Sequence, residues 1–348
     1  MPTLCVHSHL VADRPPVPQS RRTRHRLLTA GLCALALAFG THPAGAAETV
    51  RLAVLKYGTA NWELDVIHRH HLDTAQDLAL AVKEYAGPQA TTVALQAGDT
   101  DLAIEDWIWV ARQRTVGRPF TFVPYSTAPG ALVAGKASGI TGLAGLKGKR
   151  LGIAGGPTDK NWLTLRALAM KQQGSDLAGT VEPVYGAPPL VGEQLKEGRV
   201  DAVVTYWHYA ARLGAAGYPS VLNIKEAQQG LGIETELPMI GYCFDETWAA
   251  GHRDALVRFF RATDQARALL RDSDAEWDAL RPLMGAPDEA TFVALRDGYR
   301  AGIPTRWGAA ERAGAERLYE ALRTVGGTDA VGVAERLPAG TFWDGVAD

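Results

Sequence analysis

Two segments of the chain share one pattern, and that pattern limits the fold more than any other feature. Residues 94–107 read ALQAGDTDLAIEDW, and residues 194–207 read QLKEGRVDAVVTYW. In each segment a helix-like run ends at a glycine, an Asp occupies the following turn, and an apolar strand leads to aromatic and polar residues. The repetition predicts two similar α/β lobes. Open α/β sheets bind ligands at the carboxyl ends of their strands, so we expect a binding site between the lobes.

The first 46 residues have the pattern of a secretory signal peptide. Four arginines between positions 21 and 26 precede an apolar stretch, residues 27–40, which is too short to span a bilayer. Small residues follow at positions 44–46, as signal peptidase requires. We therefore expect cleavage near Ala46 and a periplasmic protein.

Charge and cysteine content narrow the class of protein further. The leader contributes +4 to a formal net charge of −2, which leaves −6 for the rest of the chain. An acidic protein is a poor partner for nucleic acid. Only Cys243 lies beyond the leader, so no internal disulfide is expected. We predict a monomer in which packing alone stabilises the lobes.

Hydrophobic periodicity predicts alternating strands and helices, followed by a helical carboxyl-terminal region. The expected strands are residues 50–55, 102–104, 120–124, 150–154, 181–185 and 201–205. The expected helices are residues 62–71, 90–97, 190–197 and most of 247–323, with one more starting near Asp159. Residues 131–134 are expected to carry the chain into the second lobe, and residues 238–244 to bring it back. Polar and aromatic loops are expected at residues 57–62, 105–107, 125–127 and 206–208.

Several of these phrases also match a known family. GDTDLAI at residues 98–104, SGITGLAGLKGKRLGIAGG at 138–156 and EGRVDAVVTYW at 197–207, with the helical carboxyl-terminal stretch, resemble periplasmic solute-binding proteins of ABC importers. The resemblance is to the nitrate, sulfonate, taurine and thiamine-pyrimidine type (NMT1/THI5-like, SsuA-like). It implies a type II periplasmic-binding-protein fold, with a mixed sheet flanked by helices in each lobe and two crossovers that form a hinge. Such proteins are not enzymes and carry no cofactor; they deliver a small solute to a permease in the inner membrane.

The resemblance divides the chain into four parts. They are the signal peptide at 1–46, the start of the first lobe at 47–134, the second lobe at 135–237, and the return with the carboxyl-terminal helices at 238–348.

The expected site carries carboxylates where sulfonate or nitrate binders offer small hydroxyl and amide donors. Glu105-Asp106-Trp107 and Thr158-Asp159-Lys160 occupy these positions. A carboxylate repels a bound anion, whereas it attracts a cation, and Trp and Tyr stack on cations and flat rings. We therefore predict a cationic or heteroaromatic organic solute. The predicted contacts are Asn61, Trp62, Glu105, Asp106, Trp107, Tyr125 and Ser126 from the first lobe, and Thr158, Asp159, Tyr185, Tyr206 and Trp207 from the second.

Other interpretations of these residues stay open. The acidic residues also suit the start of a helix, where the dipole favours negative charge. A hard metal ion or its chelate is an alternative ligand, because carboxylate oxygens suit hard cations. No metal-ligand motif is recognised, however, and His68 and His71 fit a surface patch better. A thiamine-pyrimidine synthase-like enzyme or a periplasmic sensor are further alternatives, although the enzyme's cysteine-rich active-site run is missing.

Overall fold

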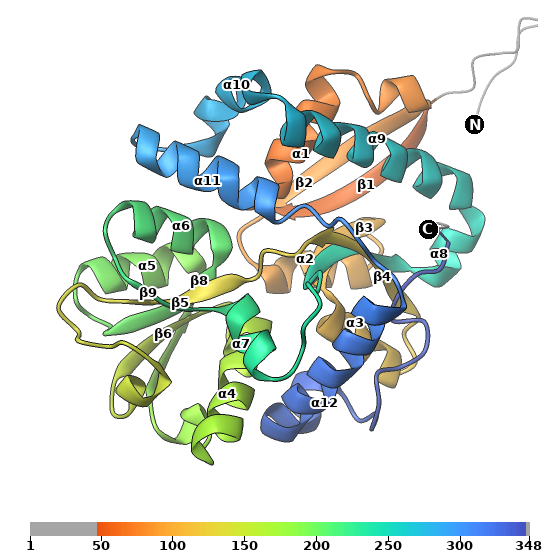
Figure 1. Ribbon diagram of the computed structural model, residues 1–348. Helices are drawn as coiled ribbons and strands as arrows, with labels where there is room; N and C mark the ends of the chain where they lie inside the picture. The colour runs from red at the N-terminus through yellow and green to blue at the C-terminus, as the bar shows by residue number, and fades with distance from the viewer. Residues whose placement is uncertain (1–46, 346–348) are drawn as a thin grey trace, which may run out of the picture. The chain divides into compact units, whose positions relative to one another are not determined.

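The computed structural model describes residues 47–345, so the predicted signal peptide lies outside the described part. The described chain contains two five-stranded mixed sheets (Figure 1). The first sheet, which defines the first lobe, has the order β2-β1-β3-β10-β4. Its strands are β1 (Glu48–Leu55), β2 (Leu78–Tyr85), β3 (Leu102–Asp106), β4 (Phe120–Ser126) and β10 (Ile240–Asp245).

The second sheet, which defines the second lobe, repeats this arrangement with the order β7-β6-β8-β5-β9. Its strands are β5 (Gly130–Ala134), β6 (Arg150–Ala154), β7 (Glu182–Gly186), β8 (Ala202–Tyr206) and β9 (Ser220–Asn223). In each sheet the fourth strand is antiparallel to both neighbours and is supplied by the chain as it crosses between lobes. The predicted two-lobed α/β fold is therefore confirmed.

Helices cover both sheets and form the carboxyl-terminal region. The first four helices along the chain are α1 (Ala60–Arg69), α2 (Pro88–Gln96), α3 (Trp107–Thr115) and α4 (Lys160–Gln173). They are followed by α5 (Pro188–Lys196), α6 (Trp207–Ala215), α7 (Ile224–Gly230) and α8 (Glu246–Gly251). The carboxyl-terminal helices are α9 (Arg253–Asp272), α10 (Asp274–Met284), α11 (Glu289–Ala301) and α12 (Ala309–Val331). Short 3₁₀ turns occur at Thr74–Gln76, Leu143–Leu146 and Leu177–Gly179.

The repeated sequence pattern has one physical cause in both lobes. Gly98 and Gly198 follow α2 and α5 with φ of 73° and 69°, in the left-handed region that glycine adopts without strain. The Asp three residues after each glycine then joins the new strand to its neighbour. Asp101 accepts the backbone N–H of Arg51 at 2.8 Å, and Asp201 accepts that of Arg150 at 2.8 Å. These bonds bring β3 beside β1 and β8 beside β6.

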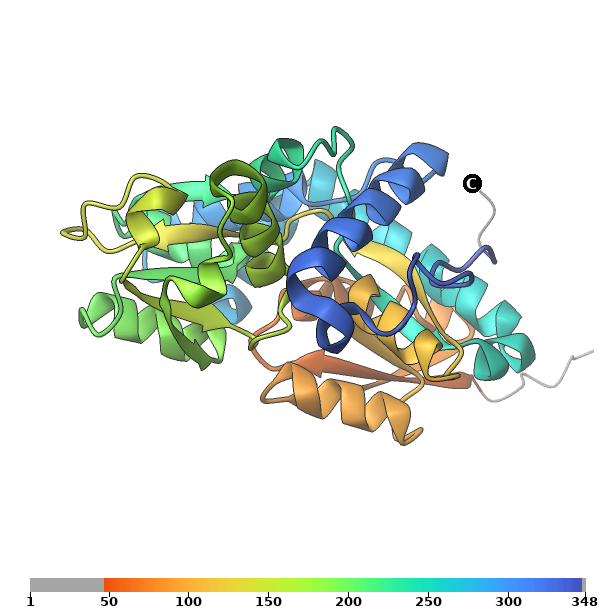
Figure 2. The same ribbon diagram turned by 90° about the horizontal axis from the view of Figure 1, so that it is seen from below.

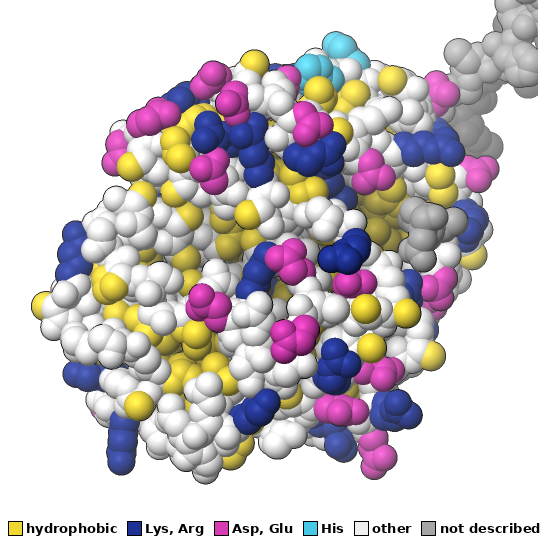
Figure 3. Space-filling model, in the orientation of Figure 1, with side chains coloured by type: hydrophobic (Ala, Val, Ile, Leu, Met, Phe, Trp, Pro, Cys, Tyr) yellow, Lys and Arg dark blue, Asp and Glu magenta, His cyan; other side chains and the backbone are white. Residues whose placement is uncertain are grey.

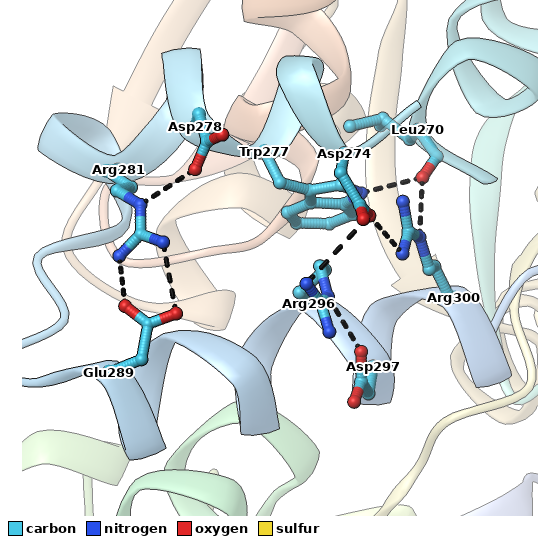
Figure 4. A network of polar contacts seen from close by, with 9 residues as sticks. All are labelled: Leu270, Asp274, Trp277, Asp278, Arg281, Glu289, Arg296, Asp297 and Arg300. Carbon is cyan, nitrogen blue, oxygen red and sulfur yellow. Dashed lines mark hydrogen bonds and ion pairs between the residues drawn. The ribbon is translucent and has the colours of Figure 1, made fainter. Parts of the chain in front are cut away.

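The carboxyl-terminal helices join the two lobes. Helix α11 packs on α6 of the second lobe, and α12 contacts both α3 and α4; Figure 2 shows α12 lying across the two lobes. Figure 4 shows the polar contacts that connect α10 and α11: Arg281 donates to Glu289, and Arg300 pairs with Asp274 at 2.7 Å. The indole N–H of Trp277 donates to the Leu270 carbonyl at 2.7 Å, so α9 is tied to the same network.

Several predicted boundaries need correction. Residues 105–107 and 206–208 are not loops. Strand β3 ends at Asp106 and β8 ends at Tyr206, and the tryptophan that follows each strand begins a helix. Strand β2 was not predicted. It is an edge strand with mostly exposed side chains, so it lacks a hydrophobic alternation. Strand β9 and helices α3 and α6 were not predicted either. Residues 131–134 lie within β5 of the second sheet, so the chain crosses at residues 127–129, before the predicted lobe boundary.

On the face drawn in Figure 3, acidic and basic side chains are interspersed, a mixture typical of a solvated surface. Within residues 47–345, every helix is too short or too polar to cross a bilayer.

Candidate functional site

A cavity of about 250 Å³ lies between the two lobes. It is lined from the first lobe by the carboxyl-terminal ends of β1, β3 and β4, and from the second lobe by those of β6 and β8. The first turns of α1, α2, α3, α4 and α6 also reach it. The site therefore lies where the topology of open α/β sheets places ligands, and several helix dipoles point their positive ends toward it.

Seven of the predicted contact residues line this cavity. They are Glu105, Asp106, Tyr125, Thr158, Asp159, Tyr206 and Trp207. The sequence brings them together because each stands at the end of a strand or the start of the next helix. Their contact with a ligand remains a prediction.

Five predicted contact residues lie outside this cavity. Asn61 donates to the Leu55 and Lys56 carbonyls and so closes the β1–α1 turn. Trp62 and Trp107 are buried in the hydrophobic core because each faces inward from its helix. Ser126 accepts the N–H of Ala128 at the crossover. Tyr185 is 43% exposed on β7, the edge strand.

The cavity also contains polar and aromatic residues that the sequence interpretation missed. These are Gln89, Trp109, Arg112 and His208. Lys160, which the sequence placed at the expected site but not among the contacts, also lines the cavity. Trp109 and Arg112 lie in the first turns of α3, a helix that was not predicted beyond the expected loop at 105–107. Helical spacing after Asp106 was the signal for them, since residues three and six positions later lie near the same helix face.

The Glu105 carboxyl group is held mainly in its neutral form. Burial raises its pKa to about 8, and the charge of Asp106 adds to that rise, although the hydroxyl of Thr91 donates to it. Near neutral pH this group is therefore a hydrogen-bond donor as well as an acceptor. It carries little of the negative charge on which the cation prediction depended.

The other two carboxylates act as helix caps. Asp106 accepts the Trp109 N–H at 2.7 Å at the start of α3, and Asp159 accepts the Asn161 N–H at 2.9 Å at the start of α4. Burial raises the pKa of Asp159, and the Lys160 ammonium 3.7 Å away opposes the rise. Because the caps and Lys160 already compensate these charges, the site is close to neutral overall, with Arg112 as a further cation.

Aromatic rings form the walls of the cavity, and packing holds them in place. Trp207 packs edge-on against Trp62 with ring centres 6.1 Å apart, and Trp62 in turn packs against Trp277 and Tyr299. Tyr125 packs against Tyr242 from behind. Lys160 lies over the ring of Tyr206 at 4.9 Å. Fixed rings offer flat apolar surfaces at low entropic cost to a flat ligand.

Cys243 does not line this cavity. Cys243 is buried in β10, and burial raises its thiol pKa well above the ordinary value, which disfavours the reactive thiolate. In the described part of the chain, His, Cys, Asp and Glu side chains form no group of three that is arranged to hold a metal ion.

We expect Glu105→Gln to make stability less dependent on pH. A carboxyl whose pKa is raised on folding keeps its proton in the folded state while the unfolded chain releases it, so stability falls as pH rises from about 4.5 to about 8. Glutamine keeps the hydrogen bond to Thr91 without titrating. In urea unfolding, the free energy of unfolding of the variant relative to the wild type should increase by up to a few kcal/mol as the pH rises to 8.

Glu182→Gln is the matched control, because Glu182 is exposed on β7. Its pH profile should parallel that of the wild type. If Glu105→Gln also gives a parallel profile, the Glu105 pKa is not raised.

Comparison with known proteins finds a family model that matches this chain. The family model described as NMT1/THI5 like matches residues 74–275, more than half of the chain. A search of curated protein sequences found no significant match.

Solved structures resemble the chain in fold. The alkanesulfonate-binding protein SsuA of Xanthomonas axonopodis pv. citri, bound to MOPS, gives a TM-score of 0.67 at 20% identity, over 86% of this chain and 99% of its own. The aliphatic sulphonate binding protein SsuA of Escherichia coli gives 0.62 at 19%, over 82% and 94%. A zinc-bound ligand binding component of an ABC-type import system from Staphylococcus aureus gives 0.59 at 11%, over 82% and 96%. At these identities the likeness establishes the fold.

Proposed function

Because the chain belongs to the NMT1/THI5-like family, we propose that it is the substrate-binding component of an ABC importer. It captures a small solute between its lobes in the periplasm and presents the closed form to an inner-membrane permease. The observation that supports this most is the cavity between two lobes of matching topology, lined by both. No bond of the solute is made or broken.

Contacts across the cavity favour capture by closure. The Gln89 side chain, on α2 of the first lobe, donates to the Gly155 carbonyl of the second lobe at 3.2 Å. Tyr57 and Tyr209 pack edge-on from opposite lobes with ring centres 6.1 Å apart. A ligand bound between the lobes adds contacts that exist only when they are closed, so it shifts the population toward that form.

The solute that suits the walls best is a heteroaromatic organic molecule. Trp109, Tyr125, Tyr206 and Trp207 supply flat surfaces, and the protonated Glu105 supplies a donor to a ring nitrogen or carbonyl. A purely cationic solute is less favoured than the sequence suggested, because Asp106 and Asp159 already cap helices. Because these two carboxylates already accept backbone hydrogen bonds, fewer of their oxygens are free for a hard metal ion, the second candidate ligand.

Native mass spectrometry of protein purified from its own periplasm tests the proposed solute. We expect a bound small molecule whose ultraviolet spectrum shows an aromatic ring. Tyr206→Leu removes the ring that faces Lys160 at the cavity wall, so it should raise the Kd of the recovered solute about tenfold, since one aromatic contact contributes roughly 1–1.5 kcal/mol.

Tyr218→Leu is the matched control, because Tyr218 stacks with Lys136 away from the cavity. It should retain the solute. Recovery of a metal ion, or of a molecule without a ring, would contradict the proposed solute class. A gene neighbourhood with a sensor kinase and no permease would favour the sensor alternative.

A further inference from the structure

A second chamber of about 370 Å³ adjoins the first cavity. The two share Gly58 and His208, so His208 lies between them. The chamber is formed by the β1–α1 turn, by α5 and α6 of the second lobe, and by the end of α10. Like the first cavity, it is bounded by residues of both lobes.

Within residues 47–345, two buried polar groups at this chamber lack hydrogen-bond partners. Both ring nitrogens of His208 are buried and unpartnered, and the residue is 6% exposed. The hydroxyl of Tyr57 is also buried without a partner. Unsatisfied buried polar atoms are costly, so each marks a place where a ligand or water supplies the missing bond. Burial, together with the charge of Arg212, lowers the pKa of His208 to about 3; the neutral ring thus offers one donor and one acceptor.

The chamber carries an excess of positive charge. Lys56, Lys196 and Arg212 line it, against a single carboxylate, Glu193, which pairs with Lys196 at 2.8 Å. Among residues 47–345, neither Lys56 nor Arg212 forms an ion pair with an acidic side chain. Arg212 donates to the Gly285 carbonyl at 3.0 Å and also to the Met284 carbonyl, both at the end of α10. Burial lowers its pKa, as for a cation without a nearby counter-charge.

We propose that this chamber binds the acidic group of the solute whose ring occupies the first cavity. The cargo would then be an elongated molecule with a flat ring at one end and a carboxylate or phosphate at the other. Its middle passes His208, and its anion meets Lys56 and Arg212. This inference rests on the proposed function and adds the second half of the ligand to it.

Inorganic phosphate is the probe for the anionic subsite. We expect phosphate, added at low ionic strength where screening is weak, to shift the His208 imidazole signals in nitrogen NMR spectra. His208→Phe assigns those signals. No shift at saturating phosphate would overturn the inference.

Lys56→Gln separates a built subsite from general attraction. Lys56 is exposed, and its side chain forms no hydrogen bond or ion pair with the rest of the described chain, so the variant should fold normally. It should weaken phosphate binding about fivefold, the range of a partly exposed ion pair. Lys147→Gln, an exposed lysine in a second-lobe loop, is the matched control and should bind like the wild type. Equal weakening in both variants would overturn the inference.

The mass of the copurifying solute separates this inference from the proposed function. A ring-bearing solute without an acidic group would overturn the inference and leave the proposed function intact. A solute with no ring would contradict the proposed solute class, even if phosphate still shifted His208. A ring with a carboxylate or phosphate supports both.

Discussion

Replacing Glu63 by Leu is expected to lower the free energy of unfolding by about 3–5 kcal/mol, because it leaves a buried charge without its partner. Glu63 is fully buried on α1. It accepts hydrogen bonds from the Tyr242 hydroxyl at 2.6 Å and the Tyr299 hydroxyl at 3.0 Å, and it pairs with Arg267 at 3.0 Å. Leucine satisfies none of these groups, and among the described residues the one other acid paired with Arg267 is Asp264, 3.6 Å away and largely exposed.

Urea unfolding of three variants tests this cluster. Glu63→Leu should show the full loss, whereas the double variant Glu63→Leu/Arg267→Met should recover much of it, because neither charge is then buried alone. Glu197→Ala, at an exposed site in an ion pair with Arg199, is the matched control and should change stability by less than about 1 kcal/mol. If Glu63→Leu loses no more than the control, the cluster does not stabilise the fold.

The cluster also matters to the candidate site. The Arg267 guanidinium lies 5.5 Å from the centre of the Tyr125 ring, and Tyr125 lines the cavity between the lobes. Loss of Glu63 should therefore loosen one wall of that cavity as well as the core behind it. The solute bound by Glu63→Leu should decrease even where the protein remains folded.

Trp207→Ala is expected to cost about 3–5 kcal/mol of stability, because it opens a cavity among packed rings. Trp207 begins α6, lines the first cavity and packs against Trp62 and Tyr299. A side chain at Gly298 of α11 would meet the Trp207 ring at 2.7 Å, so α11 approaches the indole closely. The substitution thus removes a wall of the cavity and the contact between α6 and α11.

Thermal unfolding and native mass spectrometry measure the two effects of Trp207→Ala separately. We expect a lower Tm together with loss of the bound solute. Trp248→Ala is the matched control, because Trp248 stacks on His252 outside the cavity and should destabilise less while retaining the solute. A Trp207→Ala protein that keeps the solute would show that this wall does not contribute to binding.

The sequence predicted the fold well because the determinants of the fold are local. Glycine after a helix, Asp in the turn and an apolar strand recur in both lobes, and their bonds to Arg51 and Arg150 are the same. Strand β2 escaped prediction because its exposed side chains remove the periodic signal. The sequence of β5 and β10 predicted crossovers, but both segments are strands within the sheets, and their place there depends on long-range pairing.

The site was less predictable because several of its properties depend on contacts between distant residues. The positions of Glu105, Asp106 and Asp159 at strand ends and helix starts followed from the pattern. The compensation of their charges did not follow, because the neutral state of Glu105 comes from its burial in the folded chain. His208 received little weight because its neighbours in the second chamber, such as Lys56, lie far away in the sequence.

The two sheets differ in how their strands are distributed along the chain. All strands of the second sheet lie within residues 130–223, whereas the first sheet needs β10, at Ile240–Asp245, between β3 and β4. As the polypeptide is synthesised, the second lobe has its complete set of strands before the first lobe has its own. The lobe that begins first in the chain is therefore the lobe whose sheet can be completed last.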